Sequence, residues 1–285
     1  MQKDIEQKIS EALLTANLQS RDDLCRFKRQ IAKKYKLPIL KNSDLLEIYH
    51  KLPTKKRVDM EMILRKRPIR SLSGIVNVSV LTKPWHCPGK CIFCPNEKNL
   101  PKSYLAKEPA VQRALANNFD PYKQVAMRLS ALRATGHPTD KVELRIIGGT
   151  WSAYPRKYQE WFVGECFRAC NEFLGYSKAP SALQACKALG AFHNFQFLQQ
   201  KNERAKTRIV GIAVETRPEY ITADEIKFMR GLGITKVELG AQSIYDDVLR
   251  LNKRGHNVAT TITATRLLKN AGFKVSYQMM PGLYG

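Results

Sequence analysis

The sequence predicts an α/β protein in which an incomplete parallel (β/α) partial barrel follows a small basic α-helical module. Residues 1–70 show helical patterns, whereas residues 71–285 alternate short β-type apolar runs with helical segments. The crossovers between these runs are long, which is typical of parallel strands with helices outside the sheet. We therefore expect two domains, a basic helical module over 1–70 and an α/β core over 71–285.

Three helices are expected in the module. Apolar residues recur at near-helical spacing over 4–16. The second helix covers 20–36, with Ser20 placed as its N-cap. Ser43 is expected to cap a third helix, which Pro53 ends.

Five strands are expected in the core. They cover 75–81, 142–147, 208–214, 236–239 and 274–279. Helical patterns fill the gaps at about 121–135, 157–174, 223–232, 245–251 and 258–271. Glycines and polar residues follow the strands, and the carboxyl ends of strands in a parallel barrel are where active sites are built. The fold therefore indicates an enzyme.

The charge of the chain indicates a polyanionic partner. Its 285 residues include 48 Lys+Arg against 25 Asp+Glu, a formal net charge of +23. Hydrophobic residues make up 44%, which is ordinary for a globular protein and excludes disorder as the main state. A charge of this size is well above the magnitude of about 2–8 that solubility requires in a small domain. We therefore favour a nucleic acid as partner.

The chain shows no sign of membrane insertion or export. It contains no run of about 18 apolar residues, the length that a transmembrane helix requires. The first residues, MQKDIEQKISEALL, lack the apolar core and the small-residue cleavage site of a signal peptide. We therefore expect a cytoplasmic protein without a membrane partner.

Three of the seven cysteines stand close together after the first expected strand, as Cys87, Cys91 and Cys94. Spacings this short suit Zn²⁺ or an iron–sulfur cluster. A structural zinc site needs four ligands, and only His86, directly beside Cys87, is a near fourth. Three thiolates on a four-iron cluster leave one iron open for a cofactor. An iron–sulfur cluster is therefore favoured, with zinc as the alternative.

The compact cysteine spacing resembles that of radical S-adenosylmethionine (SAM) enzymes. In those enzymes a 4Fe-4S cluster holds SAM on its open iron and passes it an electron, which gives a 5′-deoxyadenosyl radical. The resemblance implies that the cysteines hold the cluster and that residues after the next three strands contact SAM. These are Gly148, Gly149 and Thr150 after the second strand, Glu215 and Arg217 after the third, and Gln242 and Ser243 after the fourth.

Short motifs throughout the chain resemble one specific family, the catalytic subunit of Elongator and its single-chain bacterial and archaeal relatives. They include Lys83-Pro84, Glu108-Pro109, Asp120-Pro121-Tyr122, Gly136-His137, Asp140-Lys141-Val142-Glu143, Glu215-Thr216-Arg217-Pro218, Arg254-Gly255-His256 and Met279-Met280-Pro281. In combination these motifs are far more specific than the cysteine spacing alone.

The resemblance implies an enzyme that modifies the wobble uridine of tRNA. In that family the radical takes hydrogen from the methyl group of acetyl-CoA, and the resulting carbon radical attacks C5 of the uridine. Hydrolysis then leaves 5-carboxymethyluridine. Lys141 matches a lysine associated with acetyl-CoA. The family also carries an acetyltransferase-like domain C-terminal to this region, which we expect in a full-length chain.

A tRNA substrate agrees with the distribution of charge. Residues 51–70 hold eight basic residues and two acidic ones. Phosphate contacts by Lys and Arg supply affinity without sequence information. The candidate tRNA surface is Lys55, Lys56, Arg57, Arg65, Lys66, Arg67 and Arg70.

Three alternatives stay open at this stage. One is a radical SAM enzyme of another substrate class, of the coproporphyrinogen-oxidase or methylthiotransferase type. Another is a non-catalytic, zinc-bearing RNA-binding fragment. The third is a chain that is inactive as it stands, because five strands do not close the six-stranded partial barrel of radical SAM enzymes. We expect tRNA binding, and weak or no uridine carboxymethylation by this chain alone.

Overall fold

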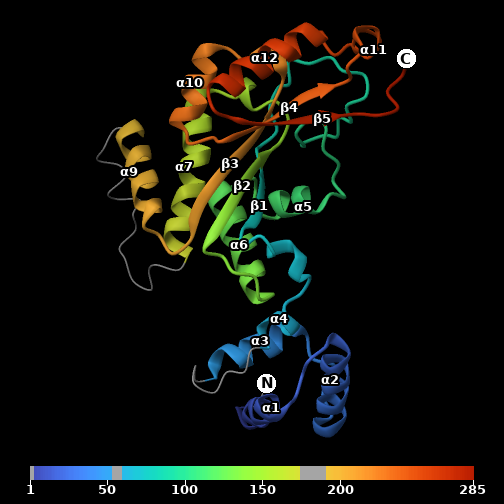
Figure 1. The fold of residues 1–285 in the computed structure, drawn as a ribbon, viewed down its shortest axis with the longest axis vertical. Helices are drawn as coiled ribbons and strands as arrows, with labels where there is room; N and C mark the ends of the chain where they lie inside the picture. The colour runs from blue at the N-terminus through green and yellow to red at the C-terminus, as the bar shows by residue number, and fades with distance from the viewer. Residues whose placement is uncertain (1–2, 53–59, 174–190) are drawn as a thin grey trace. The chain divides into compact units, whose positions relative to one another are not determined.

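The computed structural model of the protein describes residues 3–52, 60–173 and 191–285 (Figure 1). The chain divides into two compact units. One comprises Met1–Val76 with Arg128–Thr139, and the other comprises Asn77–Met127 with Asp140–Gly285. The expected domain boundary at residue 70 stays a prediction. Lys55, Lys56 and Arg57 lie outside the described residues.

The first unit is helical. Its elements before residue 76 are α1 (Lys3–Thr15), α2 (Arg21–Tyr35), α3 (Asn42–Lys51), the short α4 (Glu61–Leu64) and the 3₁₀ turn η2 (Pro68–Ser71). One apolar cluster joins α1 to α4, and it includes the fully buried Leu13, Leu45 and Leu64. Burial of such side chains contributes about 1.5–3 kcal/mol each. The unit is therefore held together by its own hydrophobic core.

Two helix starts show how far the capping predictions reach. Ser20 caps α2 as expected, since its Oγ accepts a hydrogen bond from the Asp23 N–H at 3.1 Å. The expected cap at Ser43 is wrong, because α3 begins at Asn42 with Lys41 as its N-cap. The Asp44 carboxylate accepts a hydrogen bond from the Lys41 N–H at 2.9 Å. A side chain of the first turn therefore supplies a partner for the backbone N–H at this helix start.

The second unit contains a five-stranded sheet in the order β1-β2-β3-β4-β5 (Figure 1). The strands are β1 (Val76–Leu81), β2 (Lys141–Ile147), β3 (Arg208–Thr216), β4 (Lys236–Gln242) and β5 (Lys274–Met279). The pairs β2–β3, β3–β4 and β4–β5 are all parallel. The prediction of a parallel α/β sheet is confirmed, and each strand lies where the sequence placed one.

Helices connect the strands. They are α5 (Pro109–Ala116), α6 (Pro121–Ala134), α7 (Arg156–Phe173), α9 (Ala191–Glu203), α10 (Ala223–Gly231), α11 (Asp246–Leu251) and α12 (Val258–Asn270). Helix α7 packs on β3 and α12 packs on β4 and β5. The sequence patterns missed α4, α5 and α9. No helix in the described part of the chain is long and apolar enough to cross a membrane.

The register of the sheet brings the carboxyl ends of the strands to one edge. Thr216 pairs with Leu239, and Gln242 pairs with Met279. The residues that follow β2 and the cysteine loop that follows β1 lie at the same edge, because Thr82 donates its N–H to Ile147 O at 2.9 Å. Side chains that are distant in sequence therefore meet beyond these strand ends.

Candidate active site

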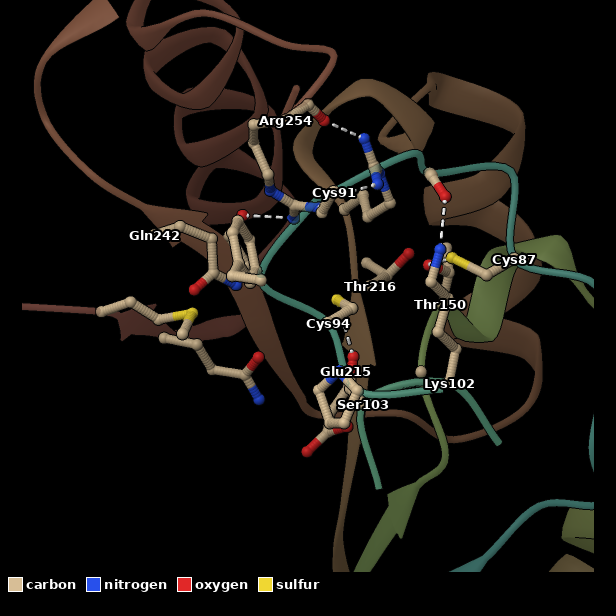
Figure 2. Close-up of a pocket in the computed structure, with 18 of the residues that line it drawn as sticks. Cys87, Cys91, Cys94, Lys102, Ser103, Thr150, Glu215, Thr216, Gln242 and Arg254 are labelled. Carbon is tan, nitrogen blue, oxygen red and sulfur yellow. Dashed lines mark hydrogen bonds between the residues drawn. The ribbon is translucent and has the colours of Figure 1, made fainter. Parts of the chain in front are cut away.

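A cavity of about 330 Å³ opens at the carboxyl edge of the sheet (Figure 2). Its walls come from the cysteine loop, from the segment after it and from the ends of β3, β4 and β5. The predicted site residues that line it are Cys87, Cys91, Cys94, Gly149, Thr150, Glu215, Arg217 and Gln242. The fold thus brings most of the predicted cluster and SAM residues around one space.

The three cysteines lie on a loop without regular structure, and each has a different neighbour. Cys87 Sγ lies 3.8 Å from the Thr150 hydroxyl, and Cys94 Sγ lies 3.0 Å from the Ser103 hydroxyl. All three thiols are free. The loop therefore presents three sulfur donors to the cavity, and Thr150 reaches one of them from the end of β2.

Cys91 is the buried member of the three and has a positively charged environment. Arg217 Nη1 and Arg254 Nη1 donate to its sulfur at 3.5 and 3.4 Å. A hydrogen bond from Cys94, assisted by Arg254 and Arg217, lowers the pKa of Cys91 to about 4. The same hydrogen bond, together with burial, raises the pKa of Cys94. The two guanidinium groups thus favour the thiolate form of Cys91, which is the form that ligates metals.

The donor set fits an iron–sulfur cluster. Thiolates are the protein ligands of such clusters, and hydrogen bonds to the sulfurs tune them. Within the described ranges, no three His, Cys, Asp or Glu side chains converge tightly enough to hold a single metal ion. The three cysteines line one cavity and so would supply thiolates to such a cluster.

The two glycines after β2 differ in role. Gly148 has φ 134°, and a Cβ there would lie 1.9 Å from Thr82 Oγ1, so it permits close packing behind the cavity. Gly149, with φ 99°, lines the cavity itself. Its missing side chain leaves room for a ligand to approach the backbone.

Glu215 lies in a buried polar layer inside the sheet. Its carboxylate accepts hydrogen bonds from the Tyr104 hydroxyl at 2.6 Å and from Arg145 Nη2 at 3.2 Å. Arg145 also pairs with Glu238 at 2.5 Å. Burial raises the pKa of Glu215, while Tyr104 and Arg145 oppose that shift. Glu215 lines the cavity and is thus anchored there by neighbouring side chains.

Gln242 and Ser243 separate at the end of β4. Gln242 has φ 71°, a left-handed backbone conformation that costs energy in a residue other than glycine. Such strained residues cluster at functional sites. Its Oε1 is buried and has no hydrogen-bond partner among the described residues, although the residue lines the cavity. Ser243 does not line that cavity; its hydroxyl accepts the Tyr245 N–H at 3.2 Å.

Lys141 lies far from the cysteines along its strand. It is exposed and begins β2, whereas Gly149 and Thr150 follow the other end of the same strand. A strand of this length spans about 20 Å. The structure therefore does not bring Lys141 into the cavity.

The described members of the candidate tRNA surface belong to the first unit. Lys66, Arg67 and Arg70 are exposed. Arg65 is half-buried, and its Nε donates to Gly136 O at 2.6 Å. Lys66, Arg67 and Arg70 are therefore accessible to a polyanion, whereas Arg65 hydrogen-bonds to the backbone of its own unit.

Several lining residues were not predicted as site residues. They include Lys102, Ser103, Tyr104, Thr216, Arg254, Gln278, Met279 and Met280. Lys102 Nζ donates to Gly89 O at 3.0 Å and so fixes the cysteine loop. Arg254 stands in the Arg-Gly-His motif, which was a usable signal, whereas no local pattern marks Lys102 or Ser103.

A family model supplies the deciding comparison. The model of the radical SAM superfamily matches residues 86–285, a range that holds all three cysteines and the strand-end residues. The chain belongs to the radical SAM superfamily. Membership of this superfamily implies SAM and a 4Fe-4S cluster as cofactors, in agreement with the three thiols at the cavity.

Curated relatives point to a narrower group. The chain is 47% identical over 229 residues to a tRNA uridine(34) acetyltransferase of Methanocaldococcus infernus, with 78% of this chain and 40% of the relative covered. It is 33% identical over 287 residues to Elongator complex protein 3 of Bos taurus, with 96% of this chain and 49% of the relative covered. The predicted resemblance is confirmed, and the chain spans less than half the length of these radical SAM relatives.

A solved structure agrees with the sequence matches. The archaeal Methanocaldococcus infernus Elp3 with an N-terminal deletion aligns with a TM-score of 0.56 at 40% identity. The alignment covers 74% of this chain and 39% of the other. This chain is therefore similar in both sequence and fold to part of that protein.

Proposed function

We propose that this chain is the SAM-cleaving part of a cytoplasmic enzyme that modifies the wobble uridine of tRNA. The reaction transfers an acetyl-CoA-derived group to C5 of that uridine and gives 5-carboxymethyluridine. The observation that carries the proposal is the cavity with three cysteines in a chain 47% identical to a tRNA uridine(34) acetyltransferase. The basic composition agrees with a tRNA substrate.

Cys87, Cys91 and Cys94 are the residues that would hold the cluster. When bound, the cluster supplies the electron that cleaves SAM. The chain contributes a cationic, largely buried setting for Cys91 through Arg217 and Arg254. Such a setting offsets the negative charge that three thiolates bring to the cavity.

SAM is expected to bind beside the cysteines, against the ends of β2, β3 and β4. Gly149 leaves space for it, and the Thr150 hydroxyl stands next to Cys87. The Gln242 Oε1, buried without a partner in the described chain, can accept a hydrogen bond from an ammonium or hydroxyl group of SAM. Glu215, anchored by Tyr104, offers a second acceptor at the cavity wall.

The remaining substrates are assigned by the resemblance. Acetyl-CoA is expected as co-substrate, handled with an acetyltransferase-like domain of the full-length protein. We keep the predicted association of Lys141 with acetyl-CoA. Because Lys141 lies at the start of β2, such a contact would be made outside the cysteine cavity. The exposed Lys66, Arg67 and Arg70 are the described part of the proposed tRNA surface.

A substrate comparison tests the proposal. The anaerobically reconstituted chain is incubated with SAM, dithionite, acetyl-CoA and a tRNA anticodon stem-loop that carries uridine at the wobble position. A stem-loop with cytidine there is the matched control. We expect the chain to release 5′-deoxyadenosine from SAM, and to release more of it with the uridine stem-loop than with the cytidine stem-loop. Failure to cleave SAM, together with one bound zinc per chain, would favour the RNA-binding alternative. SAM cleavage without any response to RNA would indicate another substrate class.

A further inference from the structure

Two arginines at the carboxyl edge of the sheet are almost completely buried. Arg217 is 6% exposed and Arg254 is 5% exposed. Removing a guanidinium from water is costly unless hydrogen bonds and opposite charge compensate it. Arg254 contacts the Cys91 sulfur and donates from Nη2 to Gly240 O at 2.6 Å. Neither of these two neighbours is a carboxylate, and one of them is a cysteine of the proposed cluster.

The surrounding backbone is shaped to admit both guanidinium groups. A Cβ at Gly89 would lie 1.9 Å from Arg217 Nη1, and a Cβ at Gly240 would lie 2.7 Å from Arg254 Nη2. A Cβ at Gly255 would lie 3.1 Å from Arg217 Nη2. Side chains at these positions would displace the arginines. Three glycines from separate parts of the chain therefore make room for the same pair.

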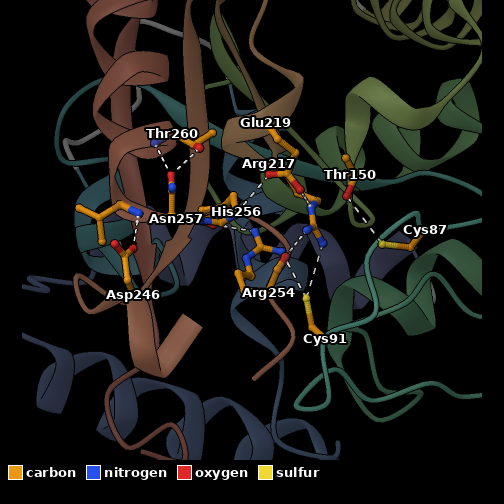
Figure 3. A network of polar contacts seen from close by, with 12 residues as sticks. Cys87, Cys91, Thr150, Arg217, Glu219, Asp246, Arg254, His256, Asn257 and Thr260 are labelled. Atoms are coloured by element: carbon orange, nitrogen blue, oxygen red, sulfur yellow. Dashed lines mark hydrogen bonds and ion pairs between the residues drawn. The ribbon is translucent and has the colours of Figure 1, made fainter. Parts of the chain in front are cut away.

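A polar network holds the pair in place (Figure 3). Arg217 Nε donates to Glu219 Oε1 at 2.5 Å, and Arg217 Nη2 donates to the backbone oxygen of Arg254. His256 Nδ1 lies 3.2 Å from Glu219 Oε2. Each guanidinium is thus fixed on one side by the protein and directed at the Cys91 sulfur on the other (Figure 3).

We infer that Arg217 and Arg254 are positioning residues that hold Cys91 as a cluster ligand and raise the reduction potential of the cluster. The inference rests on the proposed function, because it requires a cluster on the three cysteines. One-electron reduction of a cluster adds negative charge, and N–H···S hydrogen bonds from two cations stabilise the reduced form. Arg217 then acts on the cluster through Cys91, which differs from the SAM contact that its sequence position predicts.

The test measures the cluster itself. Wild-type chain, Arg217→Gln and Arg254→Gln are reconstituted anaerobically with iron and sulfide, and their iron content is determined. The midpoint potential is then measured by dithionite titration monitored by electron paramagnetic resonance. We expect both variants to show a more negative potential than wild type at equal iron content, or a lower iron content. Arg254→Lys keeps the charge but loses the planar donor geometry, so it should lie between wild type and Arg254→Gln.

A matched control removes an arginine elsewhere in the same unit. Arg168 on α7 pairs with Glu165 and does not line the cavity, so Arg168→Gln should leave iron content and potential unchanged. If Arg254→Gln is insoluble, the lysine variant and Arg217→Gln still decide the question. Wild-type iron content and potential in both glutamine variants would overturn the inference alone. A wild-type chain that assembles no cluster would overturn the proposed function as well.

Discussion

Arginine serves opposite purposes in the two units of this chain. In the helical unit Arg67 and Arg70 are exposed, where each adds charge to the surface at little cost. In the sheet unit Arg217 and Arg254 are buried against a cysteine sulfur. The net charge of +23 counts both pairs of arginines, yet of these four only the buried pair contacts a predicted cluster ligand.

The two units also differ in the kind of residue that they bury. The core that joins α1 to α4 is an apolar cluster, so its stability is expected to depend on packing. The carboxyl edge of the sheet buries Thr150, Glu215 and Arg217, whose partners must all be in place. Substitutions at that edge should therefore have larger consequences than substitutions on the helical surface.

The largest expected effect is on cluster assembly. Cys91→Ser replaces the buried sulfur between the two arginines by a poorer ligand. Iron content should fall, and SAM cleavage should drop by at least about 100-fold, since loss of even an outer partner costs 10–100-fold. Iron assay and quantification of 5′-deoxyadenosine measure both effects. Cys25→Ser, at an exposed cysteine of the helical unit, is the control. Undiminished SAM cleavage by Cys91→Ser would contradict the account.

The next effect concerns backbone packing at the edge. In Gly148→Ala the added Cβ would lie 1.9 Å from Thr82 Oγ1, at a residue whose φ is 134°. This substitution should destabilise the protein by about 2–4 kcal/mol. Gly74→Ala, at φ 78° with no atom within 4 Å of the added Cβ, should cost only about 1 kcal/mol. Denaturant unfolding of both variants measures the difference. Equal losses would show that the close contact with Thr82 is unimportant.

A pH effect distinguishes the buried network from surface charge. Burial opposes ionisation of Glu219, but His256 and Arg217 lower its pKa from 4.5 to about 2. A carboxylate with a lowered pKa stabilises the fold above its unfolded pKa, and this contribution disappears as the pH falls toward 2. Glu219→Gln should therefore be less stable than wild type at pH 7, by about 1–3 kcal/mol.

The same reasoning fixes the shape of the pH profile. The difference in unfolding free energy between wild type and Glu219→Gln should shrink between about pH 5 and pH 2. Unfolding by denaturant at several pH values gives this difference directly. A gap that does not depend on pH would mean that the charge of Glu219 contributes nothing to the network.

The smallest effect is on tRNA affinity. Arg67→Gln with Arg70→Gln should weaken tRNA binding about 10-fold and lower the slope of log affinity against log salt by about 1 for each residue. Lys33→Gln with Lys34→Gln, two exposed lysines on α2, removes the same charge elsewhere in the unit. Fluorescence anisotropy over a salt series separates the pairs. Equal losses would show that net charge alone, and not this surface, determines binding.

The sequence predicted most elements because apolar periodicity is a local property. It placed every strand, but it ended β3 at 214 and β4 at 239, whereas they continue to Thr216 and Gln242. The residues beyond the expected ends are polar or small, and all but Ala241 line the cavity, so the requirements of the site hide the strand pattern there. Lys102 and Ser103 were not predicted as site residues because tertiary folding brings them to the cysteines from a segment without a local signal, whereas the Arg-Gly-His motif at Arg254 was not assigned to the site.

One spectrum tests the central claim that the three cysteines hold a SAM-binding cluster. The reconstituted, dithionite-reduced chain is examined by electron paramagnetic resonance before and after addition of SAM. We expect the signal of one four-iron cluster per chain, a change in that signal when SAM is added, and its loss in Cys91→Ser. Stoichiometric zinc without such a signal, or a cluster signal that SAM leaves unchanged, would contradict the account.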